Sequence, residues 1–201
     1  MEKYEKWIIK DYDVEFIDAS HTYLVNGVIV PSITTILKNK FSNKYNGIPK
    51  NVLRRASELG TQMHLAIQQY EEQNIDCDLK ELKNYKFLKR QYKWTCIENE
   101  KPVILFMDNK PIACGRIDMI GSINNEMGVF DFKRTSVLDK DYLGYQLNLY
   151  RIAYQQSYGT EIGFLRGIHL REDVRKFVQI PINEELTVKL IEEWREQNES
   201  I

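Results

Sequence analysis

The sequence predicts an α/β protein with a mixed central β-sheet that contains an antiparallel meander and is flanked by helices. Three observations predict this class. Apolar residues between 50 and 73 recur every three or four positions, which is typical of an amphipathic helix. Three apolar runs bounded by turn residues follow one another between 102 and 135, as in a meander. A helical segment then separates the meander from two further apolar runs, so strands and helices alternate in this half of the chain.

The first half of the chain is expected to form a hairpin followed by helices. Residues 12–30 alternate between apolar and polar, and Asn26-Gly27 favours a tight turn between two short strands. Ser32 is typical of a residue that caps a helix at its N-terminus. Helices are therefore expected over three segments, 32–39, 50–73 and 79–94.

The second half is expected to carry the sheet. Asp108-Asn109 and Asn124-Asn125 mark the turns of the meander. The strands are expected over 102–107, 112–121, 128–135, 163–170 and 176–182, with helices over 140–157 and 183–198. Asn183 is a plausible N-cap of the last helix. We expect one domain over 1–201, in which 1–95 hold the hairpin and first helices and 96–201 hold the sheet core and the C-terminal helix.

Composition excludes several classes of protein. Hydrophobic residues make up 43% and charged residues 28% of the 201 residues, as in ordinary globular proteins. The charged N-terminal segment is unlike a signal peptide, and no apolar run has the length of a membrane span. The cysteines, Cys77, Cys96 and Cys114, are scattered, which favours free thiols in the cytoplasm over disulfides or a zinc site. The net charge of −1 means that any nucleic-acid contact must use local positive charge.

Acidic and basic residues on neighbouring predicted strands suggest metal-dependent chemistry. Asp131 and Lys133 lie two apart on one strand, so their side chains point the same way, with Val129 on the same face. Asp118 lies on the preceding strand, within cross-strand reach of Asp131 if the register fits. Two such carboxylates favour Mg²⁺ or Mn²⁺, and Lys133 would orient water or stabilise negative charge. The simpler interpretation is an exposed ion pair on a strand.

Three other polar residues fit the same site. His64 borders the apolar stripe of the helix over 50–73, one turn after Gly60, where it is either packed or a metal ligand. Gln146 occupies an apolar position of the helix over 140–157, so it either ties down the core or faces a cleft. Glu100 precedes the first meander strand and is either solvated or part of the site.

The order of these residues resembles the RecB-type branch of the PD-(D/E)XK nuclease superfamily, which includes phage-type exonucleases. The resemblance covers about residues 15 to 155. Its elements are His64 on a helix, Glu100, Gly115-x-Ile117-Asp118, Asp131-x-Lys133 and Gln146-x-x-x-Tyr150. The N-terminal segments Asp18-x-x-His21-x-Tyr23 and Val30-Pro31-Ser32-Ile33-Thr34-x-Ile36-Leu37 are also similar to phage members. Ile117 replaces the proline of the superfamily's name, a change common in this branch.

The resemblance implies a restriction-endonuclease-like core and a Mg²⁺- or Mn²⁺-dependent deoxyribonuclease. His64, Asp118 and Asp131 would ligate the metal, with the Phe132 carbonyl as a possible fourth ligand. Lys133 would be catalytic, with Gln146 and Tyr150 supporting the site or touching the DNA backbone. Some relatives hold an iron–sulfur cluster on four cysteines, and the three cysteines here lead us to expect none.

The expected substrate is single- or double-stranded DNA ends, cut by an exonuclease in recombination, replication or DNA processing. Two segments offer local positive charge. The first has six basic residues and no acidic one: Lys38, Lys40, Lys44, Lys50, Arg54 and Arg55. The second, 83–94, interleaves basic residues with aromatic ones, which either stack on bases or form the buried face of a helix.

Other interpretations stay open at this point. The same site would serve an endonuclease or a flap nuclease, or the fold would be a catalytically silent DNA-binding module. An α/β domain with an accidental motif order is a further alternative. A helicase or annealing protein is a possible partner, and relatives that form rings make an oligomer possible. We expect no membrane partner.

Overall fold

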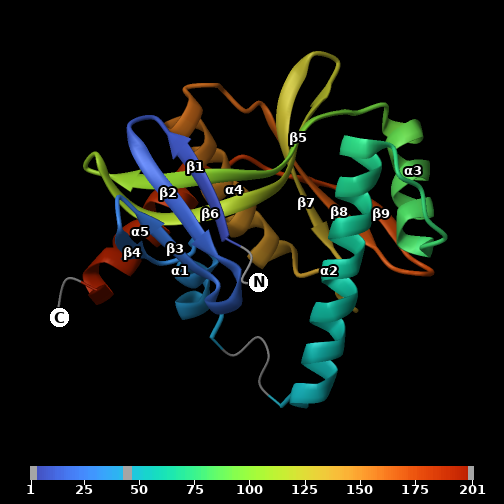
Figure 1. Cartoon of the computed structure of the whole chain (residues 1–201), viewed down its shortest axis with the longest axis horizontal. Coiled ribbons are helices and arrows are strands. Elements are labelled where there is room, and N and C mark those ends of the chain that lie inside the picture. The colour runs from blue at the N-terminus through green and yellow to red at the C-terminus, as the bar shows by residue number, and fades with distance from the viewer. Residues whose placement is uncertain (1–3, 43–46, 199–201) are drawn as a thin grey trace.

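The computed structural model describes residues 4–42 and 47–198, which form two β-sheets and five α-helices (Figure 1). The smaller sheet is antiparallel with the strand order β1-β2-β3-β4. Its strands are β1 (Tyr4–Ile9), β2 (Tyr12–Ile17), β3 (Thr22–Val25) and β4 (Val28–Val30). The short 3₁₀ turn η1 (Asp18–Ser20) links β2 to β3. The predicted hairpin is therefore part of a larger sheet.

The larger sheet has the order β5-β6-β7-β8-β9 and confirms the predicted mixed topology. Its strands are β5 (Thr95–Met107), β6 (Lys110–Ile123), β7 (Glu126–Lys133), β8 (Phe164–Leu170) and β9 (Arg175–Ile180). Strands β5, β6 and β7 form the predicted antiparallel meander. The pair β7–β8 is parallel and β8–β9 is antiparallel. A parallel pair needs a crossover, and helix α4 between β7 and β8 supplies it.

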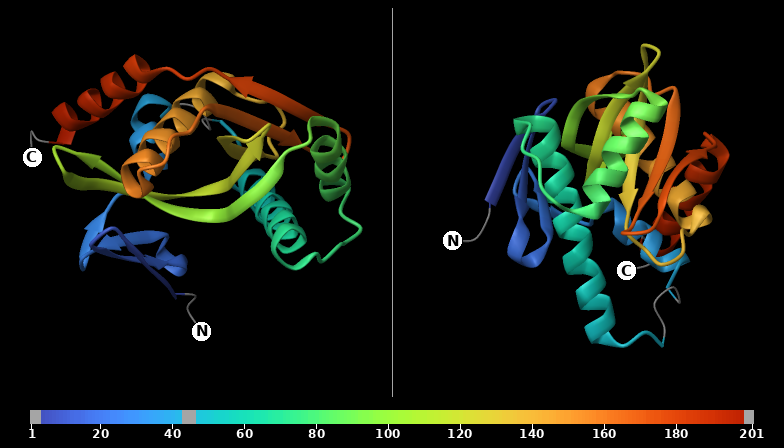
Figure 2. Two further views of the ribbon diagram at one scale, coloured as in Figure 1. Left: turned by 90° about the horizontal axis from the view of Figure 1, so that it is seen from above. Right: turned by 90° about the vertical axis from the view of Figure 1, so that its right-hand side faces the viewer.

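The helices cover both faces of the larger sheet (Figure 2). They are α1 (Ile33–Lys40), α2 (Lys50–Gln73), α3 (Lys80–Tyr92), α4 (Lys140–Tyr158) and α5 (Glu184–Asn198). One face packs against α1, α4 and α5. The other face packs against α2 and α3 over one half and against the smaller sheet over the other half. Phe16 and Tyr23 of the smaller sheet meet Ile104 and Cys114 there.

Helix boundaries confirm most of the expected ends. Asn183 is the N-cap of α5, because its Oδ1 accepts a hydrogen bond from Leu186 N at 3.0 Å. Ser32 precedes α1 as expected, but its hydroxyl is not bonded to the helix backbone; it shares hydrogen bonds of 2.9 Å with Thr34 and Thr35. Helix α3 ends at Tyr92, before the predicted end at residue 94.

Two features of the first half differ from the sequence predictions. Strand β1 was not predicted, because its alternation is masked by Glu5 and Lys6 on an edge strand. On α2, the predicted apolar stripe is buried only in its second part, at Met63 and Ile67, whereas Ala56 is exposed. The first turns of α2 project beyond the body of the molecule, so no sheet covers them (Figure 1).

A glycine in β7 shows how closely the sheet is packed. Gly128 pairs with Phe164 across β7 and β8, and a Cβ at Gly128 would lie 2.1 Å from the Phe164 ring. We expect Gly128→Ala to lower the free energy of unfolding by about 1–3 kcal/mol. Gly144 on α4 has nothing within 4 Å of a Cβ, so Gly144→Ala should raise that free energy by about 0.4–1 kcal/mol. Urea unfolding measures both, and equal losses in the two variants would contradict this packing.

The three cysteines are free and lie in different environments: Cys77 is exposed, Cys96 half-buried and Cys114 buried. Burial raises the pKa of the Cys96 and Cys114 thiols to about 12, so both stay protonated and unreactive near neutral pH. Among the helices of the described residues, none has the length and apolar character needed to cross a bilayer.

Candidate metal centre and active site

The candidate site lies where strands β6 and β7 separate. Their ladder ends at the pair Met119–Phe130. Beyond this pair, the Asp118 side chain replaces the next backbone hydrogen bond of the ladder. Its Oδ2 accepts a hydrogen bond from Phe132 N at 2.6 Å. Continued by one position, this register brings Asp118 opposite Asp131, and the charge of Asp131 acts on Asp118. The gap between the two strands thus brings the two carboxylates together.

His64 reaches this gap from α2, anchored by the buried neighbours Met63 and Ile67. Its Nε2 lies 3.1 Å from the Phe132 carbonyl oxygen, and because a carbonyl only accepts, Nε2 carries the proton. Its Nδ1 faces Asp118 Oδ1 at 3.6 Å and Glu100 Oε1 at 3.9 Å. An imidazole held by a backbone carbonyl, with its other nitrogen towards carboxylates, has the orientation of a metal-ligating histidine.

Glu100 is the third member of this cluster. Glu100 lies on β5 between Asn99 and Lys101, which pair with Met119 and Ile117 of β6. It therefore lies opposite Asp118 of β6. Its φ of +46° is a left-handed conformation that costs a non-glycine residue about 1–2 kcal/mol. One ligand atom each from His64, Glu100 and Asp118 all lie within 4.8 Å of one another. Such strain at a polar cluster is typical of a functional position.

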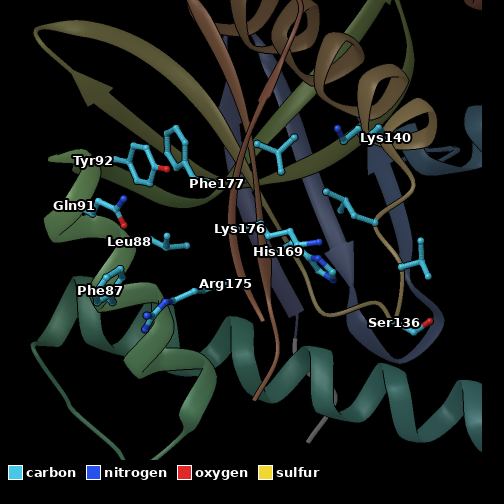
Figure 3. A pocket seen from close by; sticks show the side chains of 13 residues that line it. Phe87, Leu88, Gln91, Tyr92, Ser136, Lys140, His169, Arg175, Lys176 and Phe177 are labelled. Atoms are coloured by element: carbon cyan, nitrogen blue, oxygen red, sulfur yellow. The ribbon is translucent and has the colours of Figure 1, made fainter. Parts of the chain in front are cut away.

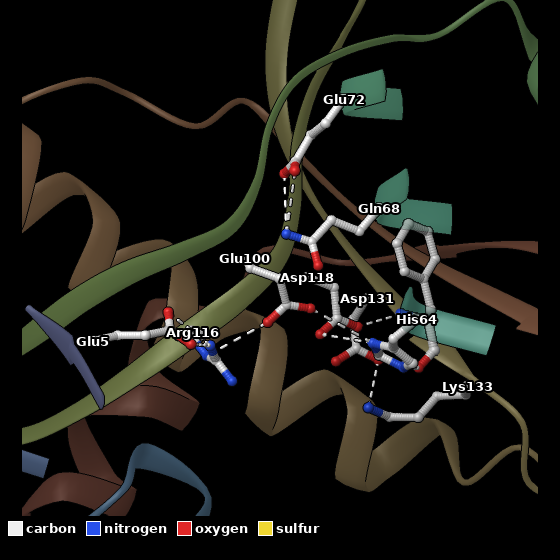
Figure 4. Close-up of polar contacts among 10 residues, drawn as sticks. Glu5, His64, Gln68, Glu72, Glu100, Arg116, Asp118, Asp131 and Lys133 are labelled. Atoms are coloured by element: carbon white, nitrogen blue, oxygen red, sulfur yellow. Dashed lines mark hydrogen bonds and ion pairs between the residues drawn. The ribbon is translucent and has the colours of Figure 1, made fainter. Parts of the chain in front are cut away.

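Asp131 and Lys133 complete the group, and they point the same way, as predicted. Lys133 Nζ lies 2.5 Å from Asp131 Oδ2 in a largely buried ion pair (Figure 4). Burial acts to lower the pKa of Lys133, but Asp131 and Asp118 outweigh burial and raise it. Lys133 is therefore a cation, suited to stabilise negative charge rather than to accept a proton.

The electrostatics show a deficit of positive charge. Burial raises the pKa of Asp118 to about 7. The charge of His64 opposes this rise, whereas the negative charges of Asp131 and Glu100 add to it. Burial would lower the pKa of His64, but Asp118 and Glu100 outweigh burial and raise it to about 9. Carboxylate oxygens and one imidazole are a donor set that suits Mn²⁺ or Mg²⁺. By their chemistry, these residues fit a divalent cation.

The ligand set differs in part from the predicted one. The structure groups Glu100 with His64 and Asp118, whereas Asp131 faces Lys133. The Phe132 carbonyl is engaged by His64, so in this arrangement it orients the histidine. Ligation by Asp131 or by that carbonyl stays a prediction.

Gln146 and Tyr150 lie on one face of α4 and both are buried. The close approach of Tyr150 requires Gly115, where a Cβ would lie 2.8 Å from the tyrosine ring. Burial raises the pKa of Tyr150, which stays a phenol. Gln146 Oε1 has no hydrogen-bond partner among the described residues, and a buried amide oxygen in that state favours a donor from a ligand or water.

A pocket of about 410 Å³ opens onto this cluster. The acidic residues Glu100 and Asp118 line this pocket together with His64. Its other lining residues bring hydroxyl, imidazole and cationic groups: His21, Tyr23, Ser32, Thr34, Thr61 and Arg116. Gly60 also borders the pocket, with nothing within 4 Å of a Cβ, so the α2 backbone is open to the pocket at this point.

Arg116 was missed by the sequence predictions. Its Nε lies 3.4 Å from Glu100 Oε2 and its Nη1 lies 3.2 Å from Glu5 Oε1, as Figure 4 shows. Its position two residues before Asp118 on the same strand was the available signal, because such residues share a face of a regular strand. The ion pair with Arg116 helps to hold Glu100 beside His64 and Asp118, the other candidate ligands.

The two basic segments differ in which side chains are exposed and could contact DNA. Lys38 is exposed, and its charge acts on His21 at the pocket. Lys40 instead pairs with Glu193 at 3.4 Å, and Lys44 lies outside the described residues. In the second segment, Tyr85 and Trp94 are buried, whereas Phe87 and Tyr92 are exposed. In the first segment, the charge of Lys38 therefore reaches the pocket although its side chain does not line it, and the second segment is part core and part surface.

No protein-family model matches this chain. No curated protein is significantly similar to it. Among solved structures, 17 chains are similar. One of them, described as "Crystal structure of SSO0001", is 21% identical over 82% of this chain and 86% of that chain, with a TM-score of 0.36. That similarity shows neither a shared family nor a shared activity.

Proposed function

We propose that this protein is a metal-dependent DNA nuclease. The observation that carries the proposal is the convergence of five side chains from four elements on one gap in the sheet. They are His64 from α2, Glu100 from β5, Asp118 from β6, and Asp131 and Lys133 from β7. An accidental motif order gives no reason for residues up to 69 positions apart to meet in this way (64 to 133).

His64, Glu100 and Asp118 would hold the cation, with Asp131 beside them. A bound Mg²⁺ or Mn²⁺ supplies Lewis-acid polarisation of a phosphate and lowers the pKa of a water ligand. The proposed divalent cation also explains why three carboxylates share one buried space, since like charges repel there without a cation.

The other groups have roles that follow from their contacts. Lys133, fixed by Asp131, stabilises the negative charge that develops on the phosphate. The Phe132 carbonyl keeps Nδ1 of His64 turned towards the carboxylates. The hydroxyls that line the pocket, at Ser32, Thr34 and Thr61, are placed to donate to phosphate oxygens.

The substrate and mode of cutting are also part of the proposal. The resemblance to RecB-type nucleases favours DNA ends and an exonuclease in recombination, replication or processing. The exposed Lys38, whose charge acts on His21 of the pocket, offers positive charge for the entering strand. Free cysteines support a cytoplasmic site of action. A helicase or annealing partner, and an oligomer, fit the same proposal.

The test is degradation of end-labelled linear DNA, single- and double-stranded, with Mg²⁺, Mn²⁺ or EDTA. We expect loss of label with either metal and none with EDTA. Asp131→Asn should lower the rate by at least about a hundredfold, because Lys133 loses its ion-pair partner. Asp173→Asn, at an exposed acidic residue of the β8–β9 turn, is the matched control and should cut normally.

Two outcomes would contradict the proposal: cleavage that persists in EDTA, or an Asp131→Asn variant as active as Asp173→Asn. Closed circular DNA separates the modes of cutting. An exonuclease leaves it intact, and an endonuclease opens it. Binding without any cleavage would instead identify the silent module.

A further inference from the structure

A second pocket lies at the β8–β9 end of the larger sheet (Figure 3). It has a volume of about 640 Å³, within the range of sites for small ligands. Helix α3, strand β9 and the loop between β7 and α4 form its walls. The proposed function makes no use of it.

Aromatic rings form one wall of this pocket. Tyr92 and Phe177 stack with centroids 3.9 Å apart and an interplanar angle of 8°. Phe177 is also nearly parallel to the buried Trp94, at 5.6 Å and 20°. Tyr92 keeps 38% of its surface exposed, although it belongs to a tight stack. Exposed aromatic rings held rigidly in this way are typical of platforms for nucleic-acid bases.

Positive charge surrounds the aromatic wall. The pocket is lined by Lys140, Arg175 and Lys176, and none of its lining residues is acidic. Arg175 lies over the Phe87 ring, with its guanidinium carbon 3.8 Å from the centroid. Across residues 4–42 and 47–198, no carboxylate lies within ion-pair distance of these three cations. Three cations without acidic partners fit an anionic ligand.

His169 connects the pocket to the candidate active site. It pairs with Lys133 in the parallel ladder of β7 and β8, so the two residues are separated by one strand spacing, about 4.8 Å. His169 Nε2 lies 2.7 Å from the Thr135 carbonyl oxygen, which makes Nε2 the protonated nitrogen. The histidine is 2% exposed, and its Nδ1 has no hydrogen-bond partner among the described residues. A donor group on a ligand would satisfy this acceptor.

We propose that this second pocket binds an unpaired nucleotide of single-stranded DNA next to the site of cleavage. An unpaired base can stack on the exposed aromatic wall, whereas a base in a duplex keeps both faces covered. The phosphates on either side would meet Arg175, Lys176 and Lys140. The identity of the ligand, DNA, rests on the proposed function. The position of the pocket next to the cleavage site follows from the loop between β7 and α4, which runs from Lys133 directly into the pocket wall.

Binding of a fluorescein-labelled oligothymidylate in EDTA tests the inference without cleavage. Tyr92→Leu removes the stacking ring and keeps an apolar side chain, so it should weaken binding about tenfold. Arg175→Gln and Lys176→Gln should each flatten the dependence of log K on log salt by about 0.7. Lys189→Gln, an exposed lysine on α5, is the matched charge control and should leave the slope unchanged.

A duplex of the same sequence and a cleavage assay separate this inference from the proposed function. If the wild type cuts DNA but the three pocket variants bind oligothymidylate like Lys189→Gln, the inference is overturned and the nuclease stands. If the wild type cuts nothing but the pocket variants lose binding, the inference holds for a silent module. Should Tyr92→Leu not fold, the two charge variants decide. Equal losses of duplex and single-strand binding would also overturn it.

Discussion

Lys133→Met should lower the rate of metal-dependent DNA cleavage by about 10²–10³-fold, as expected when a preorganised cationic group at developing charge is removed. Lys133 is the one cation in direct contact with Asp131 in the described part of the chain, at 2.5 Å. Its raised pKa means that it carries charge throughout the neutral range. The measurement is the single-turnover rate on end-labelled DNA with saturating Mn²⁺.

A matched control and a second readout locate the effect. Lys110→Met changes an exposed lysine at the start of β6 and should cut at the wild-type rate. Lys133 is not a ligand in the proposed site, so the rise in Tm on adding Mn²⁺ should persist in Lys133→Met. If cleavage survived at more than about a tenth of the wild-type rate, Lys133 would not have the proposed role.

The parts of the site that could be predicted from the sequence follow from regular periodicity. Strand alternation placed Asp131 and Lys133 on one face, and the ion pair between them agrees with that. The helical period placed His64 beside the buried Met63 of α2, at the edge of the core. Asp118 was predicted to lie within reach of Asp131 only if the register fitted, and the ladder of β6 and β7, continued by one position beyond Met119–Phe130, gives that register.

The remaining parts depend on departures from regularity, which a sequence pattern does not reveal. Glu100 reaches the cluster through a backbone with φ of +46° inside a long strand, and nothing in its neighbours indicates this conformation. The separation of β6 from β7 at Asp118 is a tertiary event as well. Tyr92 and Phe177 come from distant segments, so their stack and the second pocket appear only in three dimensions.

Phe132 links the fold to the site through its backbone. Its N–H is bound by Asp118 and its carbonyl oxygen by His64, where an uninterrupted ladder would have used β6. Two candidate ligands therefore replace the sheet bonds that the separation of the strands removes. This arrangement stabilises the gap, but it also places the charge of Asp118 in a buried space beside Asp131 and Glu100.

Asp118→Asn should therefore make the metal-free protein more stable, by about 1 kcal/mol in the free energy of unfolding. The amide oxygen can still accept the hydrogen bond from Phe132 N. The change removes the cost of burying the carboxylate charge and its repulsion with Asp131 and Glu100, and these outweigh the lost attraction to His64 and Lys133, because the pKa of Asp118 is raised overall. The same change should remove most of the stabilisation by Mn²⁺. For the wild type that stabilisation is about 2.7 kcal/mol when free metal is about a hundredfold above Kd.

Urea unfolding in EDTA and in Mn²⁺ measures both effects, with Asp173→Asn as an exposed control that should stay within about 0.5 kcal/mol of the wild type. A wild type insensitive to Mn²⁺ would exclude the proposed metal centre. An Asp118→Asn variant that loses stability in EDTA would mean that its charge supports the fold. A higher free energy of unfolding in EDTA, together with the loss of stabilisation by Mn²⁺, is expected only if the strain and charge at this gap serve to bind a cation at some cost in stability.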